Sequence, residues 1–487
     1  MLNELPKSLD ETYLRVLKGI DEADREDVCR LLQCLVASIR PLDVEELAEV
    51  LAVDFDNTEG IPKLNPDWRW EDEEQSLQAA CSSLIAIVDT GRSRVVQFSH
   101  FSVKEFLISD RLAVSSKDVS RYYVSLKSAH LILAQACLGV LLHFDGGVDV
   151  DVADENSRDQ DTRVEDSPMT SFILPRHGAQ QRHAAGSPLA AYSAEHWVTH
   201  AQFENVSACI LRAMKDLFNP DKPHFSAWLQ LHDIDTRPPF DSPFGPFYIP
   251  SKSEGTPLYY ASLCGFHDLA EHLIVKHPQY IDGHSGHCMT PLVAALERNH
   301  FQITQLLHQH GADVEVRGDG ESTPLLFASW SRHVEIVRWL LSHGADVTAQ
   351  DWYDNTALHW ASINSTSLGD VARILLEHNA DPNALNKAGH TPLHFASASQ
   401  YPDKVRLLLE FGADMNTRDK DSRTPLHVAS ESGCLEATRL LLEHGADVEA
   451  EDDEGKTAFQ RASRNRNGEI MKLLSEHRAK HGGSSES

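Results

Sequence analysis

One short phrase recurs seven times along the second half of this 487-residue chain. It begins at Thr256, Thr290, Thr323, Thr356, Thr391, Thr424 and Thr457, at intervals of 34, 33, 33, 35, 33 and 33 residues. A fixed period of this length indicates stacked structural repeats, here called copies one to seven. Because one such unit cannot bury its apolar side alone, the copies are expected to stack into a solenoid.

Each phrase reads as the start of a short helix. Threonine is a good N-cap, and a proline such as Pro392 fits the first helical turn, where its missing N–H costs nothing. An apolar stripe such as Val405 and Leu408 then predicts a second helix. After this stripe, glycines are found where a helix C-terminus needs a positive φ, at Gly311, Gly344, Gly412 and Gly445.

Copies four to six have nearly identical phrase sequences. They read Thr356-Ala-Leu-His359, Thr391-Pro-Leu-His394 and Thr424-Pro-Leu-His427. The phrase sequence and the period together resemble the ankyrin repeat. The resemblance implies helix–turn–helix–hairpin units over residues 251–481, with copies one and seven as caps and residues 482–487 as a disordered tail. We also expect each histidine ring to bond its capping threonine and nearby backbone.

The amino-terminal part combines helices with one hairpin. Residues 25–39 carry apolar side chains on one helical face, and Asp43 with Glu46 forms a capping box for a second helix. Two short apolar runs, 84–88 and 95–98, predict a β-hairpin.

A further helix is expected to close this region. Ser102 and Glu105 have the spacing of a capping box, and Phe101 and Phe106 that of a hydrophobic staple. Helices followed by a hairpin and a closing helix suggest a winged-helix domain. We therefore expect a winged-helix-like and helical region over residues 1–143.

Two segments connect this region to the repeats. Residues 144–187 are rich in Asp and Glu and then in Pro, Gly, Ser, Gln and His, which predicts an acidic disordered linker. Residues 188–250 contain an amphipathic helix and then prolines, and are interpreted as a helical neck that docks on copy one. The expected fold class is mostly α: an ankyrin-repeat solenoid of seven copies, preceded by an α+β winged-helix-like domain and a helical neck.

The sequence upstream of the repeats shows a second resemblance. The segments 5–13, 40–47, 98–107 and 194–202 resemble the region just after the nucleotide-binding core of fungal NACHT-ankyrin proteins, which are STAND-class NTPases. The resemblance implies a sensor architecture in which repeats recognise a ligand and a winged helix locks a nucleotide-operated switch. In that family the NTPase core precedes this region, so the chain is expected to be the sensor half.

No phosphate-binding loop is expected in this chain. The nearest match, Gly455-Lys456-Thr457, has Ala450 where the upstream glycine belongs, and Thr457 is the N-cap of copy seven. The segment from His284 to Cys288 offers metal-ligand types but has no second paired set. No catalytic constellation is found either, so we expect no enzyme activity, no cofactor and no metal.

Composition disfavours nucleic acid as a partner. With 44 basic and 73 acidic residues the formal net charge is -29, which repels phosphate backbones. The helix expected before the hairpin, 43–49, would put carboxylates into the groove. Eight scattered cysteines and the lack of a signal-like or membrane-length apolar stretch predict an intracellular, cytoplasmic protein, with the nucleus left open.

Four aromatic side chains form the candidate partner-binding set: Trp330, Trp352, Tyr353 and Trp360. Large rings at exposed slots of a concave face are typical of binding hot spots. An equally weighted alternative has Trp360 packed against its neighbour and only Trp352 and Tyr353 exposed. The expected partner is a protein or peptide, with basic character given the acidic balance, and self-association through the N-terminal region is a further option.

Two other functions stay open at this stage. One is that the chain is a fragment of a nucleotide-dependent NACHT NTPase switch whose catalytic core lies upstream. The other is that the aromatics and neighbouring acids form a cage that reads methylated lysine.

Overall fold

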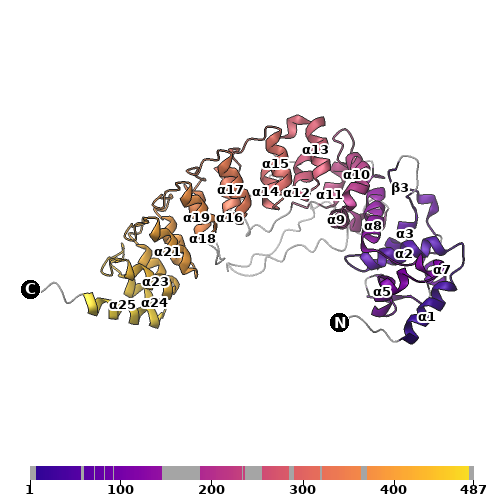
Figure 1. Cartoon of the computed structure of the whole chain (residues 1–487), viewed down its shortest axis with the longest axis horizontal. Helices are drawn as coiled ribbons and strands as arrows, with labels where there is room; N and C mark the ends of the chain where they lie inside the picture. The colour runs from indigo at the N-terminus through magenta and orange to yellow at the C-terminus, as the bar shows by residue number, and fades with distance from the viewer. Residues whose placement is uncertain are drawn as a thin grey trace, which may run out of the picture. The chain divides into compact units, whose positions relative to one another are not determined.

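The computed structural model describes residues 7–55, 60–70, 72–81, 83–91, 93–144, 187–232, 234–235, 255–283, 290–318, 321–363 and 370–481. The chain divides into two compact units, residues 1–236 and 237–487. Figure 1 follows the elements of both units along the chain. Each unit is described by itself below.

The first unit opens with helices and short strands. In order they are α1 (Lys7–Lys18), α2 (Arg25–Ala37), β1 (Leu42–Asp43), α3 (Val44–Leu51), β2 (Val53–Asp54), β3 (Lys63–Leu64), η1 (Pro66–Trp68), α4 (Glu73–Cys81), β4 (Ile85–Asp89) and β5 (Arg94–Phe98). The helices α5 (Phe101–Leu107), α6 (Asp110–Ala113), α7 (Lys117–Ser120) and α8 (Leu126–Leu141) follow.

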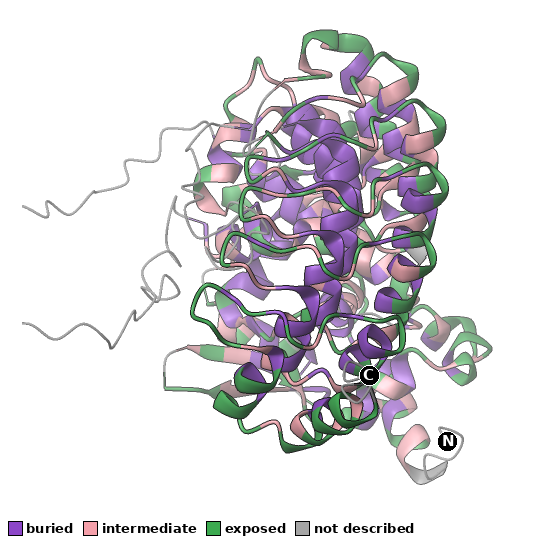
Figure 2. Cartoon of the chain, turned by 90° about the vertical axis from the view of Figure 1, so that its left-hand side faces the viewer, coloured by how far each residue is buried: buried purple, intermediate pink, exposed green. Residues whose placement is uncertain are grey.

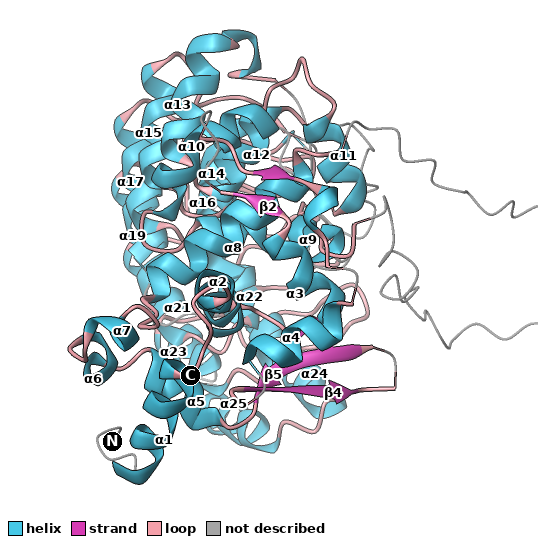
Figure 3. Ribbon diagram, turned by 90° about the vertical axis from the view of Figure 1, so that its right-hand side faces the viewer, coloured by secondary structure: helices cyan, strands magenta, loops and turns pink. Residues whose placement is uncertain are grey.

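A small antiparallel sheet forms the wing of this unit. The strand order is β1-β5-β4, with Val96 of β5 opposite Leu42 on one side and Ile87 on the other. Figure 3 shows β4 and β5 lying side by side as the hairpin that the apolar runs predicted. The expected capping box of Asp43 and Glu46 is present at the start of α3. The predicted winged-helix arrangement is therefore confirmed in this part of the chain.

Three details of the prediction are wrong. The helix directly before the hairpin is α4, whereas the sequence analysis placed residues 43–49 there. Its residues include Glu73 and Glu74, so this helix is acidic as well. The N-cap of α5 is His100 and not Ser102, because the His100 ring accepts a hydrogen bond from the Ser102 backbone N–H at 3.2 Å. Phe101 is largely exposed and forms no staple.

The helices expected to form a separate neck belong to the first unit. These helices are α9 (Ala190–Ala201), α10 (Val206–Leu217) and α11 (His224–Leu231), and they pack with α8. Trp197 of α9 and Trp228 of α11 are fully buried, with ring centroids 5.3 Å apart. Burial of two indoles provides a large apolar contact.

A buried carboxylate ties α9 to the winged helix. Glu49 of α3 accepts hydrogen bonds from Ser187 Oγ at 2.5 Å and from the Leu189 backbone N–H at 2.7 Å. Arg69 pairs with the other oxygen of Glu49. The residues that flank the expected acidic linker therefore belong to one unit, while residues 145–186 lie outside the described residues.

The second unit contains seven helix pairs in its described residues. They are α12 (Pro257–Cys264) with α13 (His267–Lys276), α14 (Pro291–Glu297) with α15 (Phe301–Gln309), α16 (Pro324–Ser331) with α17 (Val334–Ser342), α18 (Ala357–Ile363) with α19 (Asp370–Glu377), α20 (Pro392–Ala398) with α21 (Pro402–Glu410), α22 (Pro425–Ser432) with α23 (Leu435–Glu443), and α24 (Ala458–Arg464) with α25 (Gly468–His481). The helices carry most of the buried residues, whereas the connecting hairpins are largely exposed (Figure 2).

The helix ends follow the chemistry predicted from the sequence. Threonine side chains cap the first helices, for example Thr323, which accepts from the Leu326 backbone N–H at 3.4 Å. The four glycines that close second helices have φ between 85° and 95°. In copy four Asn379 takes this place with φ 65°, in keeping with the tolerance of asparagine for the left-handed region.

The repeated histidines bond forward as well as locally. The Thr356 backbone N–H donates to His359 Nδ1 at 3.1 Å, so the ring proton sits on Nε2, which donates to the His390 carbonyl at 3.0 Å. His394 and His427 make the same bond to the Arg423 and Lys456 carbonyls, both at 3.0 Å. Each ring thus links one copy to the next. The expectation that these histidines bond the capping threonine is confirmed.

Candidate partner-binding surface

The hairpin before copy four presents two aromatic rings to solvent. Trp352 is 62% exposed and Tyr353 is 42% exposed. They follow Asp351, which is buried and accepts hydrogen bonds from the Tyr353 and Asn355 backbone N–H groups, both at 2.8 Å. These bonds fix the backbone of the turn that carries the two rings, which are called the aromatic tip below.

Of the other two predicted aromatics, Trp360 is buried and Trp330 is half-buried. Trp360 is only 7% exposed, and its Nε1–H donates to Asp351 Oδ2 at 3.0 Å. Trp330 on α16 is half-buried, with its ring centroid 5.9 Å from that of Phe327. The expectation of an exposed Trp360 is therefore corrected: its ring is buried and its N–H bonds the carboxylate that holds the turn. The alternative in which Trp360 packs is the one that the structure has.

Asp351 is the residue that the sequence analysis missed. One of its oxygens holds the turn and the other bonds Trp360, so it joins the exposed aromatic tip to the buried indole. Burial raises the pKa of Asp351 above its ordinary value, and the hydrogen bonds that it accepts oppose this rise. A signal was present in the sequence, because Asp419 and Asp452 also stand five residues before a phrase threonine.

A lysine from the following hairpin covers one face of the tip. The Lys387 backbone N–H donates to the Tyr353 carbonyl at 2.8 Å. Its Nζ lies 5.4 Å from the centroid of the Trp352 ring, donates to the Trp352 carbonyl, and is 3.9 Å from Asp354. This is a cation–π arrangement. The chain's own ammonium thus occupies one face of Trp352.

Backbone hydrogen bonds join further hairpins to this one. The Lys420 N–H donates to the Ala388 carbonyl at 3.0 Å, and the Asp453 N–H donates to the Asp421 carbonyl at 3.0 Å. The hairpins of copies four to seven are therefore connected tip to tip. A preorganised surface loses less conformational entropy when a partner binds.

An acidic pocket of about 430 Å³ lies beside Trp352. Its charged lining consists of four carboxylates and two cations: Glu321, Asp346, Asp351, Asp354, Arg317 and Lys387. Arg317 is already paired with Glu321 at 3.2 Å. Carboxylates therefore outnumber cations in this pocket.

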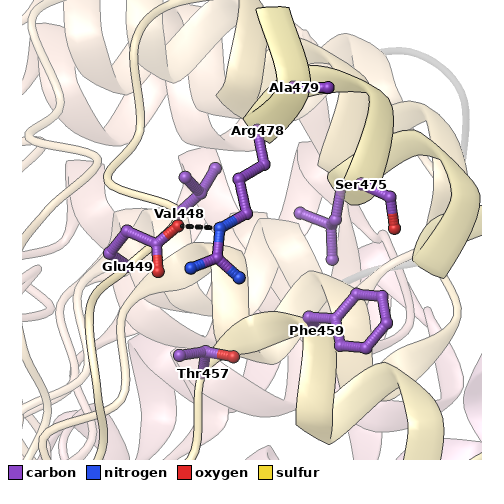
Figure 4. A pocket seen from close by; sticks show the side chains of 8 residues that line it. Val448, Glu449, Thr457, Phe459, Ser475, Arg478 and Ala479 are labelled. Atoms are coloured by element: carbon purple, nitrogen blue, oxygen red, sulfur yellow. Dashed lines mark ion pairs between the residues drawn. The ribbon is translucent and has the colours of Figure 1, made fainter. Parts of the chain in front are cut away.

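A second pocket, of about 580 Å³, lies on copy seven. Figure 4 shows Arg478 reaching from α25 toward Glu449, with their ion pair at 2.8 Å, and Phe459 on another wall. Leu474 and Val448 complete its apolar lining.

A metal centre and a membrane span are two further kinds of site that a chain can carry. The described residues contain no group of three or more His, Cys, Asp or Glu side chains that could hold a metal ion. The segment from His284 to Cys288 lies outside the described part of the chain. Within the described ranges, no helix is long and apolar enough to cross a bilayer.

Two family models match the chain. The model for ankyrin repeats matches residues 258–351, 352–419 and 401–483. Residues 258–483 are ankyrin repeats. The model described as the winged helix domain of GPI inositol-deacylase matches residues 18–117, which include α2 to β5. The repeats and the winged-helix domain expected from the sequence are both confirmed.

Two fungal proteins are similar to this ankyrin-repeat chain. "Azaphilone pigments biosynthesis cluster protein L" of Monascus ruber is 29% identical over 324 residues, which are 64% of this chain and 61% of that protein. "Vegetative incompatibility protein HET-E-1" of Podospora anserina is 26% identical over 121 residues, 25% of this chain and 8% of that protein. The chain therefore matches less than two thirds of the length of either relative.

Proposed function

We propose that the chain is a non-enzymatic interaction module that binds a protein partner through the aromatic tip of copy four. Ankyrin repeats are a protein-interaction scaffold, and a scaffold takes its specificity from exposed side chains. The observation that carries the proposal is the exposure of Trp352 and Tyr353 on a turn that Asp351 fixes. Rigid aromatic anchors lose little conformational entropy on binding.

The chemistry around the tip supports a basic partner. Four carboxylates and two cations line the pocket beside Trp352. A basic side chain of the partner would meet this excess of negative charge, and the other face of the indole would stack on its apolar portion. Because Lys387 already covers one face of Trp352, a closed cage for methylated lysine would first have to displace it. The methyl-lysine function is therefore the weaker alternative.

The experiment compares recovery of partners by the full chain and by two matched variants. Trp352→Ala with Tyr353→Ala is expected to reduce partner recovery at least tenfold, in line with loss of a hot spot. The control is Trp68→Ala, which removes another exposed indole, on η1 of the first unit. Equal recovery by wild type and the double variant would refute the proposal, and peptides with their Lys and Arg replaced would test the basic character.

A second candidate role rests on the winged-helix domain. A winged helix next to ankyrin repeats fits a STAND-type signalling protein, in which the repeats sense a ligand for a nucleotide-operated switch. We propose this as the setting of the interaction module, in the cytoplasm. An in-frame phosphate-binding loop upstream in the transcript would support it, and a transcript without one would remove it.

A further inference from the structure

We propose that copy seven carries a second docking surface, and that it takes an acidic protein segment with an apolar anchor. The surface, called the end face below, consists of Phe459, Gln460, Ser463 and Arg464 on α24 with Lys472, Ser475, Arg478 and Ala479 on α25. It is separate from the aromatic tip of copy four.

Comparison of equivalent positions within the chain identifies this face. Phe459 is the third residue of its phrase, and the leucines at this position in the six preceding copies are at most 1% exposed. Phe459 itself is 38% exposed. Ser463 is exposed, whereas the equivalent residues of the other copies are fully buried, for example Ser430 and Ser397. In earlier copies the next copy covers these positions.

The outer helix of copy seven is built differently from the others. Where copy six has Gly445 to end its helix, copy seven has Arg478, and α25 continues to His481. Lys472, Ser475 and Ala479 recur at helical spacing and therefore share one side of α25. Ser475 and Ala479 also line the pocket of about 580 Å³ together with Phe459 and Leu474. The pocket thus has an apolar floor, and Arg478 lines its edge, where it is paired with Glu449 at 2.8 Å.

Charge distinguishes this copy from the rest of the protein. Residues 457–481 contain six Lys or Arg and two Asp or Glu, in a chain that has 44 basic and 73 acidic residues. Arg464 and Lys480 form no ion pair within the part of the chain that the structure describes. Lys472 is well exposed on α25, and its ion pair with Glu476, also exposed, is long at 3.9 Å, so it adds little against a partner's carboxylate. A segment with carboxylates around one apolar side chain is complementary to this surface.

The helix cap of copy seven also needs no following copy. Gln460 replaces the phrase histidine and accepts from the Thr457 backbone N–H at 2.8 Å, so it caps its own helix. Unlike His427, it needs no carbonyl from a following copy. The start of α24 is therefore capped without a bond to a further copy, and Phe459 beside this cap is exposed.

The test selects binders from a library of random 12-residue peptides on the full chain. We expect a class of peptides that loses binding at least tenfold with Phe459→Ser and keeps it with Phe411→Ser. Phe411 is the matched control because it is also 38% exposed and lies in the same unit. The peptides of this class are expected to be acidic with an apolar residue near the middle.

A second variant tests the charge independently of Phe459. Lys472→Glu with Arg478→Glu should weaken the same peptides at least tenfold, while Arg406→Glu with Arg439→Glu, on α21 and α23, should leave them bound. Trp352→Ala with Tyr353→Ala should also leave them bound, which separates this test from that of the aromatic tip. The proposal is overturned if no peptide depends on Phe459 or if the dependent peptides are neutral or basic. It is also overturned if sedimentation shows a wild-type dimer that Phe459→Ser dissolves, because the occupant would then be a second copy.

Discussion

Trp360 donates its indole N–H to Asp351, 3.0 Å away and nine residues earlier in the chain. The same carboxylate holds the turn that carries Trp352 and Tyr353. Copy five has Asn386 at the equivalent place, and there the residue nine positions later is Phe395, which has no donor. The match of acid and indole is particular to copy four, because Asp419 of copy six has Val428 nine positions later and Asp452 of copy seven has Arg461.

This match predicts the effect of an isosteric change. Asp351→Asn retains an acceptor for the turn, but its amide N–H group would face the donors of Trp360 and of the Asn355 side chain. We expect a loss of about 1–3 kcal/mol in the free energy of unfolding, the usual cost of a buried polar group left without its partner. Urea unfolding at pH 7 measures it. Trp360→Phe in the same chain should recover part of the loss, and an additive double variant would contradict the pairing.

The phrase histidines predict a dependence of stability on acid pH. Burial lowers the pKa of His359 and that of His394 to about 4, and it also lowers the pKa of His427. Between about pH 6.5 and pH 4 the unfolded chain binds protons at these rings and the folded chain does not. Their contribution to stability is therefore complete above pH 6.5 and is lost as the pH falls toward 4.

Urea midpoints at pH 7.5 and pH 5 test this dependence. The wild type should unfold at a lower urea concentration at pH 5. A variant with His359→Gln, His394→Gln and His427→Gln should show a smaller change, because Gln460 demonstrates that glutamine caps this position without titrating. At pH 7.5 each substitution should cost about 1 kcal/mol for the lost bond to the next copy. An unchanged pH response in the triple variant would be inconsistent with the assignment.

Lys404 predicts a response at alkaline pH. Its buried Nζ donates to the Ala361 carbonyl at 2.8 Å, and burial lowers the pKa of Lys404 to about 8. The equivalent position on other outer helices is apolar, as at Ile303 and Ile336. Between about pH 8 and pH 10.5 the unfolded chain binds the extra proton, so this residue makes stability rise with pH over that window.

Substitution of Lys404 by methionine should stabilise the chain at pH 7 by about 1 kcal/mol, since an apolar side chain of similar length replaces a buried amine. It should also remove the rise in thermal midpoint between pH 8 and pH 10. Lys420→Met, on an exposed hairpin, is the control and should change neither quantity. A destabilised Lys404→Met variant would show that the bond to Ala361 outweighs the burial of the amine.

Local chemistry made much of the fold predictable. A phrase such as Thr323-Pro-Leu specifies a cap and a first turn by itself, and glycines such as Gly445 specify a helix end. The helix α4 was missed because its buried apolar residues are few: Leu77 and Cys81 give little periodicity. The cap of α5 was missed because His100 is not among the usual capping residues.

The candidate site was only half predictable for a different reason. Exposure of Trp352 and Tyr353 follows from their place on a hairpin, which period and turn chemistry indicate. Burial of Trp360 depends on a partner nine residues away, and no propensity of the residue itself decides whether its N–H finds one. Likewise, Phe459 occupies the phrase position at which the other copies have buried leucines. Its exposure depends on what packs against it, which the sequence of the phrase does not specify.

The forward bond of the phrase histidines bears on how such an array can grow or shrink in evolution. Copies five and six carry both halves of the bond: a histidine that donates to the next copy, and, just before the threonine, the carbonyl that accepts from the previous one. After in-frame duplication or deletion of either copy, every such hydrogen bond can therefore still form. In copy seven the Lys456 carbonyl accepts from His427, but Gln460 stands where the donating histidine would be. A duplicate of copy seven would therefore follow it without a histidine bond between the two.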